Sequence, residues 1–209
     1  MYKNIIFTHY SNGRNNMKRL SKVLLSLFFV LVLVGCGNMT NTPTKKVEEF
    51  LGKYQSMDSE VMAQLDKVIS DDTDMNDKQK KKYRALLEKQ YQNLSYKIKN
   101  ESIEGDNATV DVEISVLDYA TAQAEAKKYY EEHKDEFKDK NKDDSLVEGA
   151  EETIEKTTAY IDYKLKQLEN VNDKTKYNIT FNLEKDNGKW KVKDLSDEDI
   201  EKIHGLYGV

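Results

Sequence analysis

Residues 109–116 read Thr109-Val110-Asp111-Val112-Glu113-Ile114-Ser115-Val116, with polar and apolar side chains in strict alternation. Because successive side chains of a β-strand point to opposite faces, this period predicts a strand with one buried and one solvated face. Tyr96 and Ile98 alternate with lysines just upstream, and Glu104-Gly105-Asp106-Asn107 supplies a turn between the two runs. The sequence therefore predicts a β-hairpin here.

A second hairpin is predicted near the C-terminus, where the same alternation returns. Its apolar positions are Tyr177, Ile179, Phe181 and Leu183. Asp186-Asn187-Gly188 follows, and Asn-Gly favours the positive φ angles of a two-residue hairpin turn. The apolar face continues at Trp190 and Val192. Two hairpins on one core predict a four-stranded antiparallel sheet.

Three helices are predicted before the first hairpin from apolar side chains at helical spacing, and the first and third also have a capping residue. Thr42 caps the first helix, and Pro43 lies in its first turn, where a missing N–H is tolerated. The second helix is predicted over 59–69. The third is predicted to start at Asn76, which has Gln79 three residues on, as in a capping box.

Two more helices are predicted between the hairpins and one after them. Asp118 caps the first, and Ser145 with Glu148 signals the start of the second. The apolar side chains of the second follow a narrow 4-3-4-3 seam, which predicts an antiparallel pair of helices. Ser196 caps a short tail helix with acidic residues in its first turn. The predicted fold class is α+β: a four-stranded antiparallel sheet made of two hairpins, covered by several helices, with a two-helix excursion between the hairpins.

The N-terminal region has the features of a secretion signal. From Met17 a basic segment precedes an apolar run that extends from Val23 to Val34. A helix needs about 20 residues to span a bilayer, so this run of about a dozen favours a signal peptide over a transmembrane anchor. The segment before Met17 lacks signal features of its own, and we expect translation to start at Met17.

Leu33-Val34-Gly35-Cys36 closes this apolar run and resembles the lipobox of bacterial lipoproteins. The resemblance implies cleavage before Cys36 and diacylglycerol on its sulfur. The alternative is an ordinary cleaved signal followed by a chance cysteine. Cys36 is the only cysteine, so no intramolecular disulfide can form, and lipidation accounts for an unpaired thiol in an exported protein. Two acyl chains hold a protein stably on a membrane. We therefore expect a lipid-anchored protein on the extracytoplasmic face of the cell membrane.

These assignments divide the chain into a leader (1–35), a polar tether (36–42) and a single α+β domain (43–209). The leader contains five basic residues and no acidic ones, so the mature part holds 28 basic and 38 acidic residues and a formal net charge of −10. Such a surface argues against nucleic acid and against charge-driven binding to anionic lipid. The membrane is therefore expected to be contacted through the lipid on Cys36.

A family resemblance rests on two further segments. The helix that opens Thr42-Pro43-Thr44-Lys45-Lys46-Val47-Glu48-Glu49-Phe50-Leu51 after a lipobox, and the closing hairpin Gly188-Lys189-Trp190-Lys191-Val192, are similar to those of small uncharacterised lipoproteins of Gram-positive bacteria. The resemblance implies a cystatin-like or nuclear-transport-factor-2-like fold, with a helix laid across a curved antiparallel sheet. The helical excursion departs from that pattern, and the resemblance implies no catalytic residues.

Metal sites and thiol chemistry are not expected. Asp72-Thr73-Asp74-Met75-Asn76 and Asp139-Lys140-Asn141-Lys142-Asp143 imitate the start of an EF-hand loop, but both lack its glycine at position six and its glutamate at position twelve. His133 and His204 lie far apart in the sequence, and neither belongs to a ligand motif. We expect no metal and no cofactor.

The remaining candidate site consists of four tyrosines, Tyr129, Tyr130, Tyr160 and Tyr163, which could line a groove for a glycan or a peptide. The alternative is that they are half-buried residues at helix edges. The sheet face that we expect to be covered carries no ionisable group except tyrosine, which argues against an enzyme. The predicted function is a non-enzymatic binding or interaction module of the cell envelope with an envelope protein partner. The alternatives are a ligand-binding or enzymatic pocket between sheet and helices, and a structural spacer.

Overall fold

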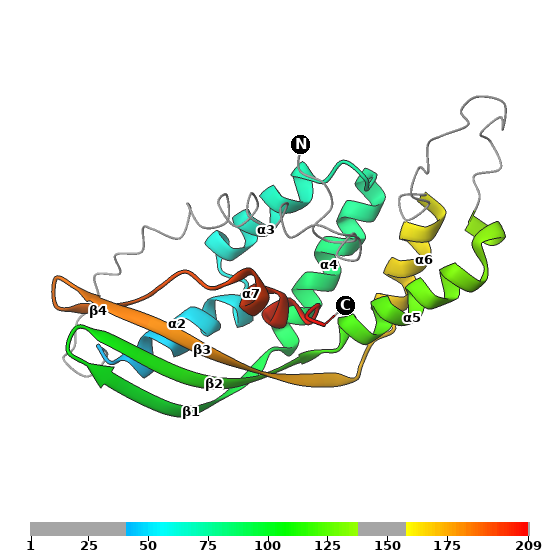
Figure 1. Cartoon of the computed structure of the whole chain (residues 1–209). Helices are drawn as coiled ribbons and strands as arrows, with labels where there is room; N and C mark the ends of the chain where they lie inside the picture. Colours follow the sequence, from blue (N-terminus) through cyan, green and yellow to red (C-terminus); the bar gives the residue numbers. More distant parts are fainter. Residues whose placement is uncertain (1–40, 138–157, 209) are drawn as a thin grey trace, which may run out of the picture.

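The computed structural model describes residues 41–137 and 158–208, and in these ranges it is an α+β fold (Figure 1). The elements, in chain order, are α2 (Pro43–Gln55), α3 (Ser59–Asp71), α4 (Asp77–Asn93), β1 (Ser95–Glu104), β2 (Asn107–Leu117), α5 (Tyr119–Glu132), the 3-10 helix η1 (Lys134–Phe137), α6 (Thr158–Glu169), β3 (Lys174–Asp186), β4 (Lys189–Val192) and α7 (Asp197–His204). The predicted fold class is confirmed.

The four strands form one antiparallel sheet in the order β1-β2-β3-β4, so spatial order follows sequence order. The central pair, β2 and β3, is in register from Asn107 opposite Glu184 to Leu117 opposite Lys174. The helical excursion α5–α6 connects these two neighbouring strands at the Leu117 end of β2. The two hairpin turns lie at the other end of the sheet, together with the first turn of α2 (Figure 1).

Both predicted hairpin turns are present. Asn187 and Gly188 connect β3 to β4 with φ angles of 50° and 77°, the left-handed pair that a type I′ turn requires. Gly105 takes a φ of 61° in the turn between β1 and β2. The short-range turn signals in the sequence were therefore sufficient to locate both reversals of the chain.

The predicted helix caps are also present. Asn76 Oδ1 accepts from the backbone N–H of Gln79 at 3.0 Å, and Gln79 Oε1 accepts from the N–H of Asn76 at 3.0 Å, which completes the capping box. Thr42 caps α2 and Ser196 caps α7 through bonds to the N–H three residues on. The predicted start at Ser145 and Glu148 lies outside the described residues.

One helix is shorter than predicted. The sequence pattern extends the first excursion helix as far as Phe137, whereas α5 ends at Glu132 and Phe137 belongs to η1. The backbone N–H of His133 bonds to the carbonyl of Tyr130, three residues back, so the last turn tightens to 3-10 geometry. This change of direction brings the Phe137 ring 5.4 Å from that of Tyr130, between centroids.

The core lies between one face of the sheet and the helices. Buried side chains of β2 and β3 on this face are Ala108, Val110, Val112, Ile114, Val116, Ile179, Phe181 and Leu183. Aromatic rings fill the space above them: Phe50 of α2 meets Phe181 at 5.6 Å between centroids, and Tyr54 of α2 meets Tyr91 of α4 at 5.1 Å. The opposite face carries polar groups such as Glu113, which pairs with lysines of the two neighbouring strands.

A β-bulge interrupts the first hairpin. Ile98 lies opposite Val112 and Asn100 lies opposite Asp111, so Lys99 is an extra residue in β1. Because side chains alternate between faces, one extra residue exchanges the faces of every residue beyond it. Glu101 and Ile103 consequently share the face of Val110 and Ala108, their partners in β2, which is the face covered by the helices.

Candidate functional site

Two places in the described residues gather interacting side chains and are the candidate sites: the first turn of α2, and an aromatic cluster on α5, η1 and α6. Asn41 is the first described residue and bonds to both sides of the β3–β4 turn. Its Nδ2 donates to the carbonyl of Gly188 at 2.8 Å, and its Oδ1 accepts from the N–H of Trp190 at 3.0 Å. The chain therefore enters the fold attached to the edge strand β4.

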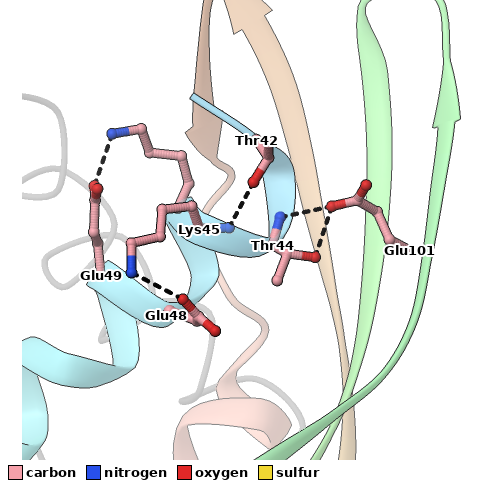
Figure 2. Close-up of polar contacts among 7 residues, drawn as sticks. Thr42, Thr44, Lys45, Glu48, Glu49 and Glu101 are labelled. Carbon is pink, nitrogen blue, oxygen red and sulfur yellow. Dashed lines mark hydrogen bonds and ion pairs between the residues drawn. The ribbon is translucent and has the colours of Figure 1, made fainter. Parts of the chain in front are cut away.

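Glu101 attaches the same turn of α2 to the opposite edge of the sheet. One of its carboxylate oxygens accepts from the backbone N–H of Thr44 at 2.8 Å and from the Thr44 hydroxyl at 2.6 Å (Figure 2). A carboxylate at the N-terminus of a helix satisfies a free N–H and interacts favourably with the helix dipole. Residues 41–44 thus connect β1 with β4, and the sheet curves around the start of α2.

The neighbouring charges on α2 are paired within the helix. Lys45 lies 3.1 Å from Glu48 and Lys46 lies 2.7 Å from Glu49, both at i,i+3 spacing (Figure 2). The hydrogen bond to Glu48 raises the pKa of Lys45. These contacts orient and stabilise the first turns of α2. Their role is therefore to hold the first turn of α2 in position next to β1 and β4.

The structure brings the four predicted tyrosines together in one cluster. Tyr130 of α5 and Tyr160 of α6 are buried, with ring centroids 4.7 Å apart. Tyr129 and Tyr163 are partly buried and stack at 5.0 Å with an interplanar angle of 23°. The cluster is separate from the main core, and it joins the two helices of the excursion.

Within this cluster the tyrosines divide into two pairs. Tyr130 and Tyr160 face inward against Phe137 and provide packing area. Tyr129 and Tyr163 lie at the surface, where the Tyr129 hydroxyl donates to Glu136 at 2.9 Å. This hydrogen bond raises the pKa of Tyr129. Only the second pair can meet a partner without rearrangement of the cluster.

Two members of the cluster were missed from the sequence. The His133 ring stacks on Tyr129 with centroids 4.0 Å apart, and its Nδ1 lies 2.8 Å from the carbonyl of Tyr129. Phe137 contacts Tyr129, Tyr130, Tyr160 and Tyr163. The i,i+4 spacing from Tyr129 to His133 was a visible signal, whereas the contribution of Phe137 depends on the turn into η1.

A buried polar contact fixes the C-terminal helix to α4. Gln90, fully buried, donates from Nε2 to the carbonyls of Leu117 and His204 at 3.0 and 2.8 Å, and its Oε1 accepts from the N–H of Leu117 at 2.7 Å. The Tyr91 hydroxyl lies 3.1 Å from His204 Nε2. Burial of the imidazole lowers the pKa of His204 to about 4, so the ring is neutral at physiological pH.

The acidic residues show no metal arrangement in the described ranges. No group of three or more His, Cys, Asp or Glu side chains that could hold a metal ion occurs in residues 41–137 and 158–208. Asp72 instead accepts from the N–H groups of Asp74 and Met75 at 2.8 and 2.9 Å and closes its loop. The second acidic loop, residues 139–143, lies outside the described residues.

The predicted lipidation site also lies outside the described residues, since Cys36 and the lipobox residues Leu33, Val34 and Gly35 precede Asn41. Among the residues that the structure covers, no helix has the length and hydrophobicity to cross a membrane. Comparisons with protein-family models, curated proteins and solved structures gave no match for this chain.

Proposed function

We propose that this chain is a lipoprotein of the cell envelope, anchored by diacylglycerol on Cys36 at the extracytoplasmic face of the cell membrane. The observation that carries the proposal is Leu33-Val34-Gly35-Cys36 at the end of a basic-then-apolar signal. The lone cysteine supports it, because an exported chain has no intramolecular partner for this thiol. The resemblance to small Gram-positive lipoproteins remains a prediction and points to the same location.

We further propose that the domain is a non-enzymatic interaction module that binds an envelope protein. The surface that favours this role is formed by Tyr129, His133 and Tyr163, which stack on one another at the edge of the α5–α6 pair. Aromatic side chains are enriched at protein interfaces because they offer large rigid contact areas together with a polar atom. The buried rings beneath hold this surface in place.

Anchoring is tested by metabolic labelling with palmitate in a bacterium that processes lipoproteins. The full-length chain is expected to incorporate the label and to fractionate with membranes, whereas Cys36→Ser is expected to do neither. Asn38→Ser is the control, since it alters the tether and keeps the sulfur. Absence of label from the wild-type chain would refute the anchor, and so would membrane retention of the Cys36→Ser variant.

Partner binding is tested by photo-crosslinking on intact cells. A photoreactive phenylalanine analogue replaces Tyr163 in one variant and Lys176, on the exposed face of the sheet, in the other. The proposal predicts a reproducible cross-linked protein band that appears with the probe at 163 and is missing with the probe at 176. The same bands from both positions, or none from 163, would contradict binding through the aromatic surface.

A further inference from the structure

We infer that the end of the sheet with the two hairpin turns faces the bilayer and that Ile103 contacts the lipid surface, so that the α5–α6 pair points away from the membrane. This inference rests on the proposed anchor at Cys36. Beyond the anchor itself, the inference identifies the surface of the domain that meets lipid and the surface that is presented to partners. Four observations support it, and each concerns a different part of the fold.

The first observation is the length of the tether. Cys36 and Asn41 are five residues apart, and a fully extended chain of this length spans at most about 18 Å. Lipid on Cys36 places that sulfur at the membrane surface. Asn41 must therefore lie within about 18 Å of the membrane surface, whatever conformation the tether adopts.

The second observation is where the chain joins the domain. Asn41 is bonded to Gly188 and Trp190 at the β3–β4 turn, and Thr44 is bonded to Glu101 in β1. Both attachments are at the hairpin end of the sheet, where the start of α2 lies beside the two turns (Figure 1). These contacts prevent the tether from leaving the domain at any other place without loss of the hydrogen bonds.

The third observation is the distance to the opposite end. β2 runs for 11 residues from the hairpin end at Asn107 to Leu117, a length of about 35 Å at the usual rise of a strand. The excursion helices begin only there, with Tyr119. This length exceeds the tether, so the lipid cannot draw the α5–α6 end to the bilayer unless the sheet lies flat.

The fourth observation is Ile103. It is 52% exposed and is the only large hydrophobic side chain classed as exposed within 41–137 and 158–208. A single exposed isoleucine is ordinary on a protein surface, but this one belongs to the hairpin end. The bulge at Lys99 places Ile103 on the same face as α2 and the tether attachment. An apolar side chain at this position can be buried by the lipid to which the chain is already attached.

The charges around the tether attachment are compatible with approach to lipid headgroups. Lys191 pairs with Asp186 beside the β3–β4 turn, and Lys193 lies 3.5 Å from Glu184. Lys45 and Lys46 pair with glutamates of α2. Charges paired in this way neither attract nor repel a membrane strongly, so the contact of Ile103 is expected to depend little on salt.

The test uses the full-length chain, lipidated in a bacterium, purified and reconstituted in vesicles of phosphatidylcholine and phosphatidylglycerol. Lipidation blocks the sulfur of Cys36, so an introduced cysteine is the single thiol available for a fluorescent probe. Three variants carry it: Ile103→Cys, Ser102→Cys at the same height on the other face of β1, and Lys134→Cys in η1. Quenching by a spin-labelled lipid headgroup is measured for each.

The inference predicts quenching at position 103 at least threefold stronger than at 134, with 102 intermediate. Equal quenching at 103 and 134 would overturn the end-on arrangement, and stronger quenching at 102 than at 103 would overturn the contact of Ile103. In both cases the mass of the same preparation would still show lipid on Cys36, so the proposed anchor would stand. A preparation without lipid would refute the proposed function and remove the basis of the inference together with it.

Discussion

At the scale of single residues, Glu101 is the side chain that joins the first hairpin to the first helix. It accepts two hydrogen bonds from Thr44, at 2.8 and 2.6 Å. Its identity as a capping residue was not visible in the sequence, because alternation counted from Tyr96 and Ile98 places position 101 on the solvated face. The extra residue Lys99 reverses that assignment.

Replacement of Glu101 by alanine is expected to destabilise the domain by about 1 kcal/mol, the usual cost of a lost helix cap. The physical reason is that the N–H of Thr44 loses its carboxylate partner. Denaturation by urea measures the change, with Glu104→Ala, in the same strand and exposed, as the control. An equal effect of the two substitutions would contradict a specific role for Glu101.

Gly205 is a second residue with a specific requirement. It ends α7 with a φ of 69°, and a Cβ built there would lie 2.1 Å from Gln90 Nε2 and 2.1 Å from the carbonyl oxygen of Leu117. Gly205→Ala is expected to cost well above the roughly 1 kcal/mol of left-handed strain alone. The control is Gly105→Ala, where φ is 61° and no atom lies within 4 Å of the added Cβ. Similar losses in urea denaturation would refute the close packing at Gly205.

His204 makes stability depend on pH. Burial lowers its pKa to about 4, whereas an unfolded histidine titrates near 6.5. Between these values the unfolded chain binds a proton that the folded chain does not, so the histidine contribution to stability is complete above pH 6.5 and falls as the pH is lowered towards 4. At pH 5 the expected loss is about 2 kcal/mol at most.

The measurement is the free energy of unfolding from urea denaturation at pH 7 and pH 5, for the wild type and for His204→Gln. The substitution removes the titrating ring and leaves every carboxylate in place, so the difference between the two pH slopes reports His204. The variant is expected to lose less stability on acidification. Parallel slopes would contradict the buried, neutral imidazole.

At the scale of secondary-structure elements, the sequence predicted the features that are determined by residues close together in the chain. The alternation of β2, the Asn187-Gly188 turn and the Asn76–Gln79 capping box each predicted an element that is present. The four tyrosines named from the sequence meet in one cluster, in which one pair is buried and the other partly buried; their role as a binding groove stays a prediction. Within α6, Tyr160 and Tyr163 are three residues apart and share a face by helical spacing.

Features that depend on tertiary contacts were not predictable from those signals. The bulge at Lys99 leaves no mark in the composition of β1, and its consequence appears only in the pairing with β2. The early end of α5 is similar, since the turn at His133 is favoured by the packing of Phe137 against Tyr130 and Tyr160. The contact between Gln90 and α7 joins segments more than 100 residues apart in the sequence.

The aromatic cluster is expected to hold α5, η1 and α6 together beyond the part of these helices that packs into the main core. Tyr160→Ala removes a buried ring and is expected to destabilise by about 3–5 kcal/mol, as large core truncations do. Because the cluster is separate from the main core, the loss should be concentrated in α5 and α6. Hydrogen exchange is the measurement: their amides should exchange faster, while those of β2 and β3 remain protected.

Tyr163→Ala is the matched control for that substitution. Its ring is only partly buried and stacks on Tyr129 at the surface of the same helix pair. A smaller effect on the same amides is expected. Uniform acceleration of exchange throughout the sheet by Tyr160→Ala would contradict a local role for the aromatic cluster.

At the scale of the whole molecule, the proposals assign different roles to the two ends of the sheet. The two hairpin turns and the first turn of α2 lie at one end, and the α5–α6 pair lies at the other (Figure 1). Asn41 is bonded at the first end, where Ile103 is exposed, and Tyr129 and Tyr163 are partly buried on the α5–α6 pair. About 35 Å of sheet lies between the two ends. This separation is compatible with the proposed lipid contact at one end and the proposed protein contact at the other.

The proposed location and orientation of this molecule depend on covalent lipid at Cys36, and the mass of the N-terminal tryptic peptide tests it most directly. The peptide is taken from protein extracted from membranes with detergent. The account predicts a peptide that begins at Cys36, ends at Lys45 and carries the added mass of a diacylglyceryl group. An unmodified peptide that contains Cys36, or a mature chain that begins at another residue, would contradict the account.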